Sequence, residues 1–529
     1  MPGDLHAQIN ATVDAFRKHV EQKLEQWRTA RDPLAFREME LEVHGDCRGL
    51  GDDLCESLLK DLVGDPVFQA ETAAAAHAAG KFRDVGRREV EVTLLGGKKV
   101  RVVVEYFRQD LRGRPGRKRK SGKRGKGGTG LYPALAALGI WFGVTPALAG
   151  EVCRQVVDSD SVRAGRAALD RRGIDIGHKQ TLNLVNSFSR RAVEQRQQWL
   201  QRMRQQAPAM ALLRGKRVVI STDGGRLRER RSSGRGRRRP SGHRGYKAPW
   251  REPKLLVIYV VGRDGKVEHT FRPIYDGTLD DCNAIFEMLV GYLKALGVHE
   301  AQQLIAVADG AKWIWERIAE LVQQVGIEPN KAVEVIDWCH AVGKLSTIAA
   351  VPAKWSYAQR ERWIRKAKRL LHKGDIDRLV ELIDTLAVGR RAKAVSEHRD
   401  YFVRNHRRMQ YKAFEAANIP TGSGAVESAI RRVVNHRMKN NGTFWIETNA
   451  EGMLMLRSYL KAGRFDDLVN WSLTQAAPWW PLNARIASSP FGNDKGAVRA
   501  RSRFRGRNLA DILRSSGCKT NPGRRGGLP

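Results

Sequence analysis

The sequence predicts a mixed α/β core that carries a helical insertion and follows a mostly helical N-terminal region with a small β-ribbon. Between residues 213 and 348, short apolar runs alternate with amphipathic stretches, which is the pattern of strands and helices packed in layers. Residues 350–410 interrupt this alternation with a stretch rich in Arg, Lys and Trp at helical spacing. Residues 1–75 show helical periodicity.

The first region, residues 1–87, is therefore expected to be helical. One face of its first helix carries an apolar stripe with 3-4-4-3 spacing, formed by Val13, Phe16, Val20, Leu24 and Trp27. We expect this stripe to pack against the next helix around Leu58, Leu59, Leu62 and Val63. A coiled coil that joins two copies of the chain is the alternative.

Residues 88–130 are expected to form a β-ribbon and then a basic linker. Alternating apolar residues lead to a Gly96-Gly97 turn and then to a second run that ends at Phe107. Nine of the sixteen residues 111–126 are Lys or Arg, and Gly and Pro prevent a helix there. The residues that we expect to contact phosphates in this arm are Arg117, Lys118, Arg119 and Lys120. A solvated loop is the alternative.

Residues 131–210 return to helical patterns. Thr145-Pro146 opens one helix, Ser161 to Leu169 forms a short one, and a glycine turn precedes a longer helix that starts at His178. A short helix, a turn and a longer helix suit a helix-turn-helix. In that arrangement a DNA groove would be faced by Lys179, Gln180, Asn183 and Asn186. An ordinary helical hairpin is the alternative.

Residues 211–349 form the first part of the predicted core. Strands are expected at 216–223, 254–262, 267–275, 303–309 and 332–338. Helices are expected at 280–296, 311–325 and 339–349. Arg263-Asp264-Gly265-Lys266 is a hairpin turn signal between the second and third strands. Three hairpin-joined strands followed by strand–helix–strand units predict a mixed sheet with helices on its faces.

The helical insertion at 350–410 separates this part from the last part of the core, residues 411–465. The core's last helix is expected to begin near Gly424. Trp355 and Trp363 in the insertion are expected in its apolar core, although stacking on an unpaired base is an alternative. The tail at 466–529 is basic, and beyond residue 485 it is rich in Gly, Ser and Arg, so disorder is expected there.

The charge of the chain points to a polyanionic partner. Its 529 residues contain 94 Lys and Arg against 57 Asp and Glu, a formal net charge of +37. Nucleic acid is the first candidate, because basic residues that neutralise phosphates release counterions. No apolar run is long enough for a membrane span, and no secretory signal is visible. The six cysteines are scattered without a C-x-x-C pair, which fits a reducing cytoplasm.

Three carboxylates stand out within this basic chain. Asp223 and Asp309 each end an apolar strand and precede a glycine, and Glu427 lies in the first turn of the helix that opens at Gly422-Ser423-Gly424. If the two strands are neighbours, the aspartates meet at one edge of the sheet, and Glu427 can close a site for two Mg²⁺ ions. Alternatively, the aspartates are turn residues and Glu427 pairs with Arg431 along its helix.

The ordered set of motifs around these carboxylates resembles DDE transposases, and more closely the ISKra-type bacterial insertion-sequence transposases. The resemblance covers about residues 88–465. The matching segments are Thr222–Arg226, Ala308–Trp315, Asp337–Ala341, Thr421–Ala429, Arg437–Lys439 and Trp445.

This resemblance implies a core of the RNase H-like fold with an insertion before the last catalytic glutamate. It implies that Asp223, Asp309 and Glu427 are the catalytic and metal-binding triad.

 The implied cofactor is Mg²⁺, with Mn²⁺ as a substitute and two ions as the expected number. The implied activity is cleavage of DNA at transposon ends and transfer of the 3′-OH ends into target DNA.

The same resemblance implies the partners and the place of action. The expected partner is double-stranded DNA, as terminal inverted repeats and as target. A homodimer or a higher oligomer is expected in the synaptic complex, and the expected location is the prokaryotic cytoplasm, associated with the nucleoid. The chain departs from the family in one respect, because it lacks the cysteine pairs that often flank the β-ribbon. Zinc is therefore not predicted.

Further residues are expected to support this site. Asp337 and His340 fit an Asp-x-x-His element that can orient a phosphate, a water or a carboxylate, although a helix cap and a buried histidine are alternatives. Of Trp313 and Trp315, one is expected in the core and one near the site. Further DNA contacts are expected from basic residues close to the carboxylates, namely Arg226, Arg235, Arg237, Arg238, Arg239, Lys312, Arg437 and Lys439.

Two other functions fit the same residues. A domesticated, non-catalytic DNA-binding protein would bind DNA without cutting it, although the chain retains all three carboxylates. An RNase H-like, structure-specific nuclease would cut DNA without joining strands.

Overall fold

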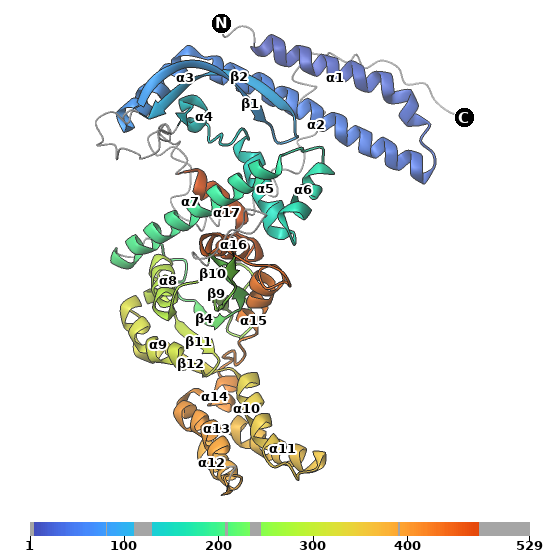
Figure 1. Cartoon of the computed structure of the whole chain (residues 1–529). Coiled ribbons are helices and arrows are strands. Elements are labelled where there is room, and N and C mark those ends of the chain that lie inside the picture. Colours follow the sequence, from blue (N-terminus) through green and yellow to red (C-terminus); the bar gives the residue numbers. More distant parts are fainter. Residues whose placement is uncertain are drawn as a thin grey trace, which may run out of the picture.

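The computed structural model of the chain has three bodies in a row (Figure 1). N-terminal helices and a curved β-ribbon lie at one end, a mixed sheet covered by helices lies in the middle, and a helical insertion lies at the other end. The described residues are 5–80, 82–109, 130–206, 210–232, 245–389 and 392–474.

The N-terminal region is helical up to Ala79, as predicted, but the first strand of the ribbon begins at Phe82, before the expected boundary at residue 88. Its helices are α1 (Leu5–Arg28), α2 (Pro33–Gly64) and α3 (Pro66–Ala79). Asp32 and Asp65 cap α2 and α3, since each side chain accepts two backbone N–H bonds and a proline follows at the first helical position.

Helix α1 packs against α2, the next helix, as predicted, but the predicted contact residues on α2 are wrong. Leu58 and Leu62 on α2 are exposed, and Val63 is buried against the β-ribbon instead of α1. Helix α1 binds an earlier part of α2, where Lys23 Nζ lies 2.6 Å from Glu42 Oε1. The side of α2 that carries Leu59 and Val63 packs against the β-ribbon, so α1 lies along the earlier part of α2.

The predicted β-ribbon is present. Its strands are β1 (Phe82–Thr93), β2 (Lys99–Gln109) and the short β3 (Gly130–Leu131). Strands β1 and β2 are antiparallel, and the Asp52 carboxylate holds their turn by accepting the N–H groups of Gly96 at 2.9 Å and Lys98 at 3.0 Å. The arm with Arg117, Lys118, Arg119 and Lys120 lies outside the described residues.

Helices then connect the ribbon to the core. They are α4 (Pro133–Ala137), α5 (Pro146–Asp158), α6 (Val162–Asp170) and α7 (His178–Gln205). On α7, Lys179, Asn183 and Asn186 are exposed, whereas the Gln180 amide donates to the carbonyl of Phe142 at 2.7 Å. The short-helix, turn, long-helix order agrees with the sequence, and its contact with DNA stays a prediction.

The central sheet has five strands in the order β10-β9-β4-β11-β12. The strands are β4 (Arg217–Gly224), β9 (Lys254–Val261), β10 (Ile274–Thr278), β11 (Gln303–Ala308) and β12 (Ala332–Ile336). Strand β9 is antiparallel to β4 and β10, whereas β4, β11 and β12 are parallel to one another. The predicted mixed sheet is therefore confirmed, and its central strands are buried on both faces, as parallel strands require.

The third strand begins later than predicted. Residues 267–273 make only an isolated bridge, Val261 to Val267, and β10 starts at Ile274. The tight turn itself is present, since the Gly262 N–H donates to the Lys266 carbonyl at 2.8 Å. Pro273 cannot donate to a ladder, so pairing with the apolar strand β9 resumes only after it.

Helices cover both faces of this sheet. They are α8 (Cys282–Ala295) and α9 (Lys312–Val325) on one side, and α15 (Gly424–Ile430) and α16 (Glu447–Lys461) on the other (Figure 1). Short 3₁₀ turns, Val298–Glu300 and Pro329–Lys331, precede β11 and β12. Five π-helical residues, Arg431–Asn435, follow α15, and α17 (Phe465–Leu473) ends the described chain.

The insertion is helical, as predicted. It contains α11 (Tyr357–Lys373), α12 (Ile376–Asp384), α13 (Ala392–Asn405), a 3₁₀ turn (His406–Arg408) and α14 (Tyr411–Ala416). Helix α10 (Trp338–Ala350) leads into it from the core. Trp363 is buried and packs near Trp355, with 6.3 Å between ring centroids, so core packing and not base stacking accounts for Trp363.

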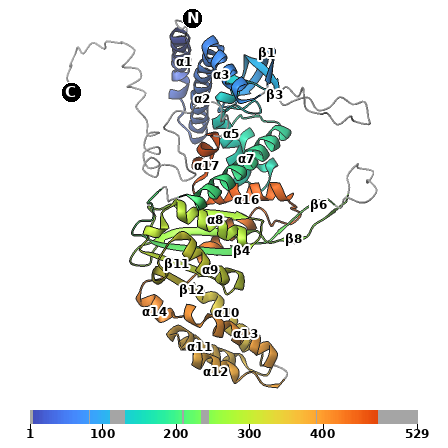
Figure 2. The ribbon, with the colours of Figure 1, turned by 90° about the vertical axis from the view of Figure 1, so that its left-hand side faces the viewer.

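Between β4 and β9 the chain makes a two-stranded arm (Figure 2). Its short strands are β5 (Leu227–Arg228), β6 (Arg231–Ser232), β7 (Tyr246–Lys247) and β8 (Trp250–Arg251). Strand β5 pairs with β8 and β6 pairs with β7, both antiparallel, so the outgoing and the returning halves of the arm lie side by side. The predicted DNA contacts Arg235, Arg237, Arg238 and Arg239 lie outside the described residues.

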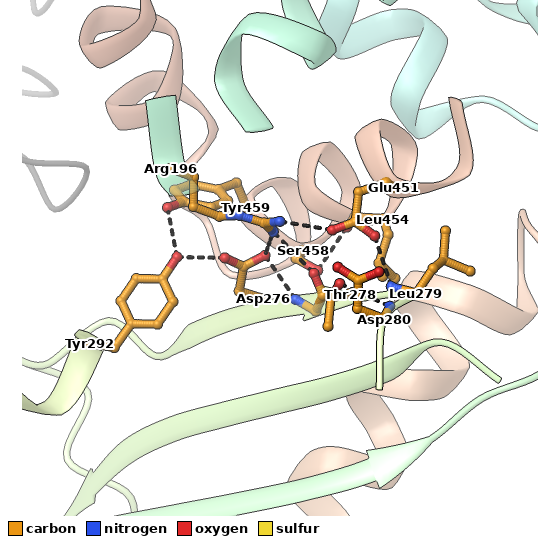
Figure 3. A network of polar contacts seen from close by, with 11 residues as sticks. Arg196, Asp276, Thr278, Leu279, Asp280, Tyr292, Glu451, Leu454, Ser458 and Tyr459 are labelled. Atoms are coloured by element: carbon orange, nitrogen blue, oxygen red, sulfur yellow. Dashed lines mark hydrogen bonds and ion pairs between the residues drawn. The ribbon is translucent and has the colours of Figure 1, made fainter. Parts of the chain in front are cut away.

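A buried charge network ties α7 to the core (Figure 3). Arg196 on α7 contacts Asp276 of β10 at 2.7 Å and Glu451 of α16 at 2.8 Å. Tyr292 of α8 donates its hydroxyl to Asp276, and Tyr459 lies 3.3 Å from the same hydroxyl. Because all these groups are buried or nearly so, they fix the helical region against the sheet.

Within the described ranges, no helix combines the length and the apolar character that a membrane span needs.

Candidate functional site

Asp223 and Asp309 occupy equivalent positions on neighbouring parallel strands. Ile220 of β4 pairs with Ala306 of β11, and each aspartate follows its strand partner by three residues. Side chains at equivalent positions of parallel strands leave the sheet on the same face. The register therefore brings these two carboxylates to one edge of the sheet.

Asp337 extends this row to the next strand. Ile336, the last residue of β12, pairs with Ala308, so Asp337 stands beside Asp309. The Asp337 N–H donates to the Ala308 carbonyl at 2.8 Å, which continues the ladder by one bond. Three adjacent strands thus end on aspartates at the same level, where ligands of α/β sheets gather.

Local hydrogen bonds hold the first two aspartates. The N–H of Gly224 donates to Asp223 Oδ1 at 2.7 Å, and the N–H of Ala311 donates to Asp309 Oδ1 at 3.0 Å. The indole of Trp315, which is buried, donates to the Asp309 carbonyl at 2.6 Å. Trp315 is therefore both a core residue and a neighbour of the site.

The pKa of Asp223 reflects the other carboxylates near it. Burial raises the pKa of Asp223, and the negative charges of Asp309 and Glu427 raise it further. The hydrogen bond from Gly224 and the positive charge of His340 act in the opposite direction without cancelling the rise. A positive charge placed among these acids would relieve the repulsion.

Glu427 reaches this edge from α15 and is held by its own loop. Ser423 Oγ donates to Glu427 Oε1 at 3.0 Å, and the Ser423 N–H donates to Asp337 Oδ2 at 2.5 Å. The N–H of Trp338 donates to the Thr421 carbonyl at 2.9 Å, which docks the same loop on α10. Glu427 forms no ion pair with Arg431 among the contacts of the described residues, so the surface pair is not the role of this side chain.

Asp337 and His340 form a tight pair beside Glu427. His340 Nδ1 lies 3.0 Å from Asp337 Oδ1 and 3.7 Å from Glu427 Oε1. The hydrogen bond to Asp337 raises the pKa of His340. Burial acts to raise the pKa of Asp337, but hydrogen bonds from His340 and Ser423 outweigh it and lower the pKa to about 2.

One group of side chains lies close enough to share a metal ion. The ligand atoms of Asp337, His340 and Glu427 are all within 4.8 Å of one another. Asp223 and Asp309 stand on the adjoining strands but outside this group. The structure therefore places Asp337 and His340, predicted as supporting residues, as close to Glu427 as ligands would be.

Among the described residues, no lysine or arginine forms an ion pair with the three predicted triad members. Within the described part of the chain, Asp223 and Asp309 form no ion pair, and Glu427 pairs only with His340. In a chain with such an excess of Lys and Arg, carboxylates gathered without a guanidinium or an ammonium fit a site for an external cation.

The structure separates the predicted DNA contacts into two kinds. Lys179, Arg226, Lys312 and Lys439 are exposed and free to meet a phosphate. Arg437 is not, and its prediction as a DNA contact is corrected. Its side chain is buried, its guanidinium donates to the Asp160 carbonyl, and it lies 5.7 Å from the Trp445 ring centroid.

Sequence reasoning also missed two residues. It gave no role to Ser423, whose N–H donates to Asp337 and whose hydroxyl donates to Glu427. It gave no role to Tyr401, whose ring packs against Gly310 beside Asp309. Ser423 lies four residues before Glu427, a spacing that could have suggested their contact, whereas nothing in the sequence pairs Tyr401 with Gly310.

By fold and site, the chain is a mixed α/β protein whose five-stranded sheet is flanked by helices and bears a carboxylate cluster at one edge. No protein-family model matches it, and neither a curated protein nor a solved structure is similar to it.

Proposed function

We propose that the protein is a DDE-type DNA transposase with an RNase H-like core, which cuts DNA at the ends of its element and joins the 3′ ends to target DNA. The observation that carries the proposal is the meeting of Asp223, Asp309 and Glu427 at one sheet edge, with no ion pair to a lysine or an arginine among the described residues. Three antiparallel strands followed by two parallel ones support the proposed core fold.

The side chains fit divalent cations of the Mg²⁺ or Mn²⁺ type. Carboxylate oxygens are the ligands that these ions prefer, and Asp223, Asp309 and Glu427 would hold them, with Asp337 and His340 beside Glu427. When bound, such ions supply charge stabilisation and an activated oxygen nucleophile for phosphodiester chemistry.

The chain's own residues would orient the DNA around this edge. Arg226 follows Asp223 by three residues and Lys312 follows Asp309 by three, so each acid is followed closely along the chain by an exposed cation. Lys439 follows the helix of Glu427. These side chains would hold phosphates on either side of the cleaved bond without carrying sequence information.

The remaining surfaces would bind DNA farther from the reaction. The exposed residues Lys179, Asn183 and Asn186 on α7 suit a DNA groove, and the network of Arg196 keeps α7 fixed relative to the sheet. Bringing two element ends together requires at least two copies of the chain, so a homodimer or a larger assembly is part of the proposal.

The test uses the full chain and the DNA that flanks its gene. With Mg²⁺ or Mn²⁺, the wild-type protein should nick DNA at the element ends and then join the 3′ ends to a plasmid. Asp309→Ala should lose both reactions and keep its affinity for DNA, because the substitution removes a metal ligand and no phosphate contact.

A matched control is Asp264→Asn, which removes an exposed carboxylate from the turn between β9 and β10. This variant should cut and join as the wild type does. Cleavage that persists in Asp309→Ala would refute the proposed site. Cleavage without joining would identify a nuclease instead, and binding without cleavage by the wild type would identify a non-catalytic DNA-binding protein.

A further inference from the structure

Tyr401 of the insertion reaches the backbone of the candidate site. A methyl group on Gly310 would lie only 1.9 Å from ring carbon Cε2 of Tyr401, so the ring rests directly on the glycine that follows Asp309. Only a residue without a side chain allows this approach. Helix α13 therefore touches the turn that carries the second aspartate.

The hydroxyl of Tyr401 is buried without a partner. The residue is 6% exposed, and its oxygen makes no hydrogen bond with any of the described residues. Buried hydroxyl groups are hydrogen-bonded in most folded proteins, so an unpaired one calls for an explanation. The neighbouring Tyr411 follows the usual rule, since its hydroxyl donates to the Ile336 carbonyl at 3.0 Å.

The surroundings of Tyr401 favour a neutral donor. Burial raises the pKa of Tyr401, and the negative charges of Asp309 and Asp337 raise it further. The phenol therefore keeps its proton beside two carboxylates. A phenol that stays protonated can donate one hydrogen bond to a carboxylate oxygen.

Asp309 has an oxygen to receive that bond. Its Oδ1 accepts the N–H of Ala311, and its Oδ2 has no partner among the described residues. A small rotation of the carboxylate is enough to change which atoms its oxygens meet, because the terminal torsion of aspartate is soft.

We propose that Tyr401 is a positioning residue that donates its hydroxyl hydrogen bond to the Asp309 carboxylate when the site holds its divalent cation. The inference rests on the proposed function, since it assumes that Asp309 is a metal ligand. It gives the insertion a role in the site, as the support of a ligand. Partners of this kind change metal affinity by about 10–100-fold in other proteins.

The test compares two tyrosines that each lose only a hydroxyl. The affinity of the metal-free full chain for Mn²⁺ is measured by electron paramagnetic resonance, and its melting temperature by calorimetry without metal. Tyr401→Phe should weaken Mn²⁺ binding by about tenfold or more. Its melting temperature should not fall, because the hydroxyl is unpaired in the metal-free protein.

Tyr411→Phe is the matched control, because its hydroxyl is bonded within the fold. It should melt at a lower temperature and bind Mn²⁺ as the wild type does. Mn²⁺ affinity in Tyr401→Phe equal to that of the wild type, measured well below both melting temperatures, would overturn the assignment of Tyr401.

Asp309→Asn separates this inference from the proposed function. If Asp309→Asn also binds Mn²⁺ normally, the metal site itself is wrong and both proposals fall. If Asp309→Asn loses Mn²⁺ while Tyr401→Phe retains it, the metal site stands and only the role of Tyr401 is overturned.

Discussion

Two groups of carboxylates lie on or beside the central sheet. Asp276 and Glu451 are paired with an arginine, whereas Asp223, Asp309 and Glu427 are not. Asp276 on β10 is fully buried, but Arg196 and Tyr292 contact it, and Arg196 also binds Glu451 (Figure 3). At the carboxyl ends of β4 and β11, Asp223 and Asp309 form no ion pair with an arginine or a lysine of the described residues.

The difference separates charges that the fold neutralises from charges that it leaves for a ligand. Burying a carboxylate is costly unless it is paired and hydrogen-bonded, and the Arg196 network satisfies this requirement. The edge cluster avoids part of the cost by staying partly exposed, with Glu427 and His340 both open to solvent. Stability and function therefore place opposite demands on acids of one sheet.

The largest expected effect on stability comes from the buried network of Arg196, Asp276 and Glu451. Arg196→Met would leave Asp276 and Glu451 without their cation in a buried place, and should lower the free energy of unfolding by about 3–5 kcal/mol. Urea denaturation of the metal-free protein measures the change. Arg204→Met, which removes a partly exposed partner of Glu287, is the control and should cost about 1 kcal/mol or less. Equal decreases in the free energy of unfolding of the two variants would show that the buried network stabilises the fold no more than an exposed ion pair does.

The next effect on stability concerns Asp337, which is buried and hydrogen-bonded like Asp276 but lies in the carboxylate cluster at the sheet edge. Its pKa falls from 3.8 to about 2, so its charged form stabilises the folded state by about 2 kcal/mol at neutral pH. Asp337→Asn should lose this amount above pH 4. Because the folded pKa is the lower one, the wild-type advantage should disappear as the pH falls through about 2.

The control for Asp337→Asn is Asp281→Asn, since both aspartates cap helices. Asp281 is exposed, and asparagine caps a helix about as well as aspartate, so little change is expected. A difference between Asp337→Asn and the wild type that stays constant down to pH 2 would contradict the prediction.

The smallest expected effect is that of Asp223→Asn, which should stabilise the folded protein instead of destabilising it. The raised pKa of Asp223 means that its charged form costs stability at neutral pH, and the cost fades as the pH falls toward the unfolded value of 3.8. Asp223→Asn should therefore stabilise the metal-free protein at pH 7 by roughly 0.2–1 kcal/mol, the usual size of repulsion between like charges on adjacent strands. Thermal denaturation with and without Mn²⁺ checks it.

With Mn²⁺ present, the order should reverse. A ligand that binds only the folded state stabilises it by about 2.7 kcal/mol at 100 times its dissociation constant. The wild type should gain this stabilisation, and Asp223→Asn should gain less of it. If Asp223→Asn is destabilised without metal, the folded protein already neutralises the charge of Asp223, as Arg196 neutralises that of Asp276.

Several local features followed from the sequence alone. Short continuous apolar runs located β4, β9, β11 and β12 to within two residues, because strands buried on both faces need continuous apolar sequence. Proline and capping residues located α5 and α6 in the same way. The strand from 267 to 275 failed because a polar segment before Pro273 resembles a strand in pattern and lacks a partner.

The site was only partly predictable. Asp223, Asp309 and Glu427 could be chosen from strand ends and a helix start, which are local features. The burial of Arg437 could not be predicted, because the Asp160 carbonyl that it binds belongs to a distant loop. The contact of Ser423 with Asp337 depends on how that loop docks against α10.

By itself, the sequence determined the helices, most of the strands and the positions where carboxylates interrupt a basic chain, because each depends on neighbouring residues. Only the tertiary structure decided which acids receive a cation from the fold. Strand order and register bring Asp223 beside Asp309, and the folding back of the insertion brings Tyr401 onto Gly310. These contacts join residues far apart in the chain, and packing of the whole sheet selects them.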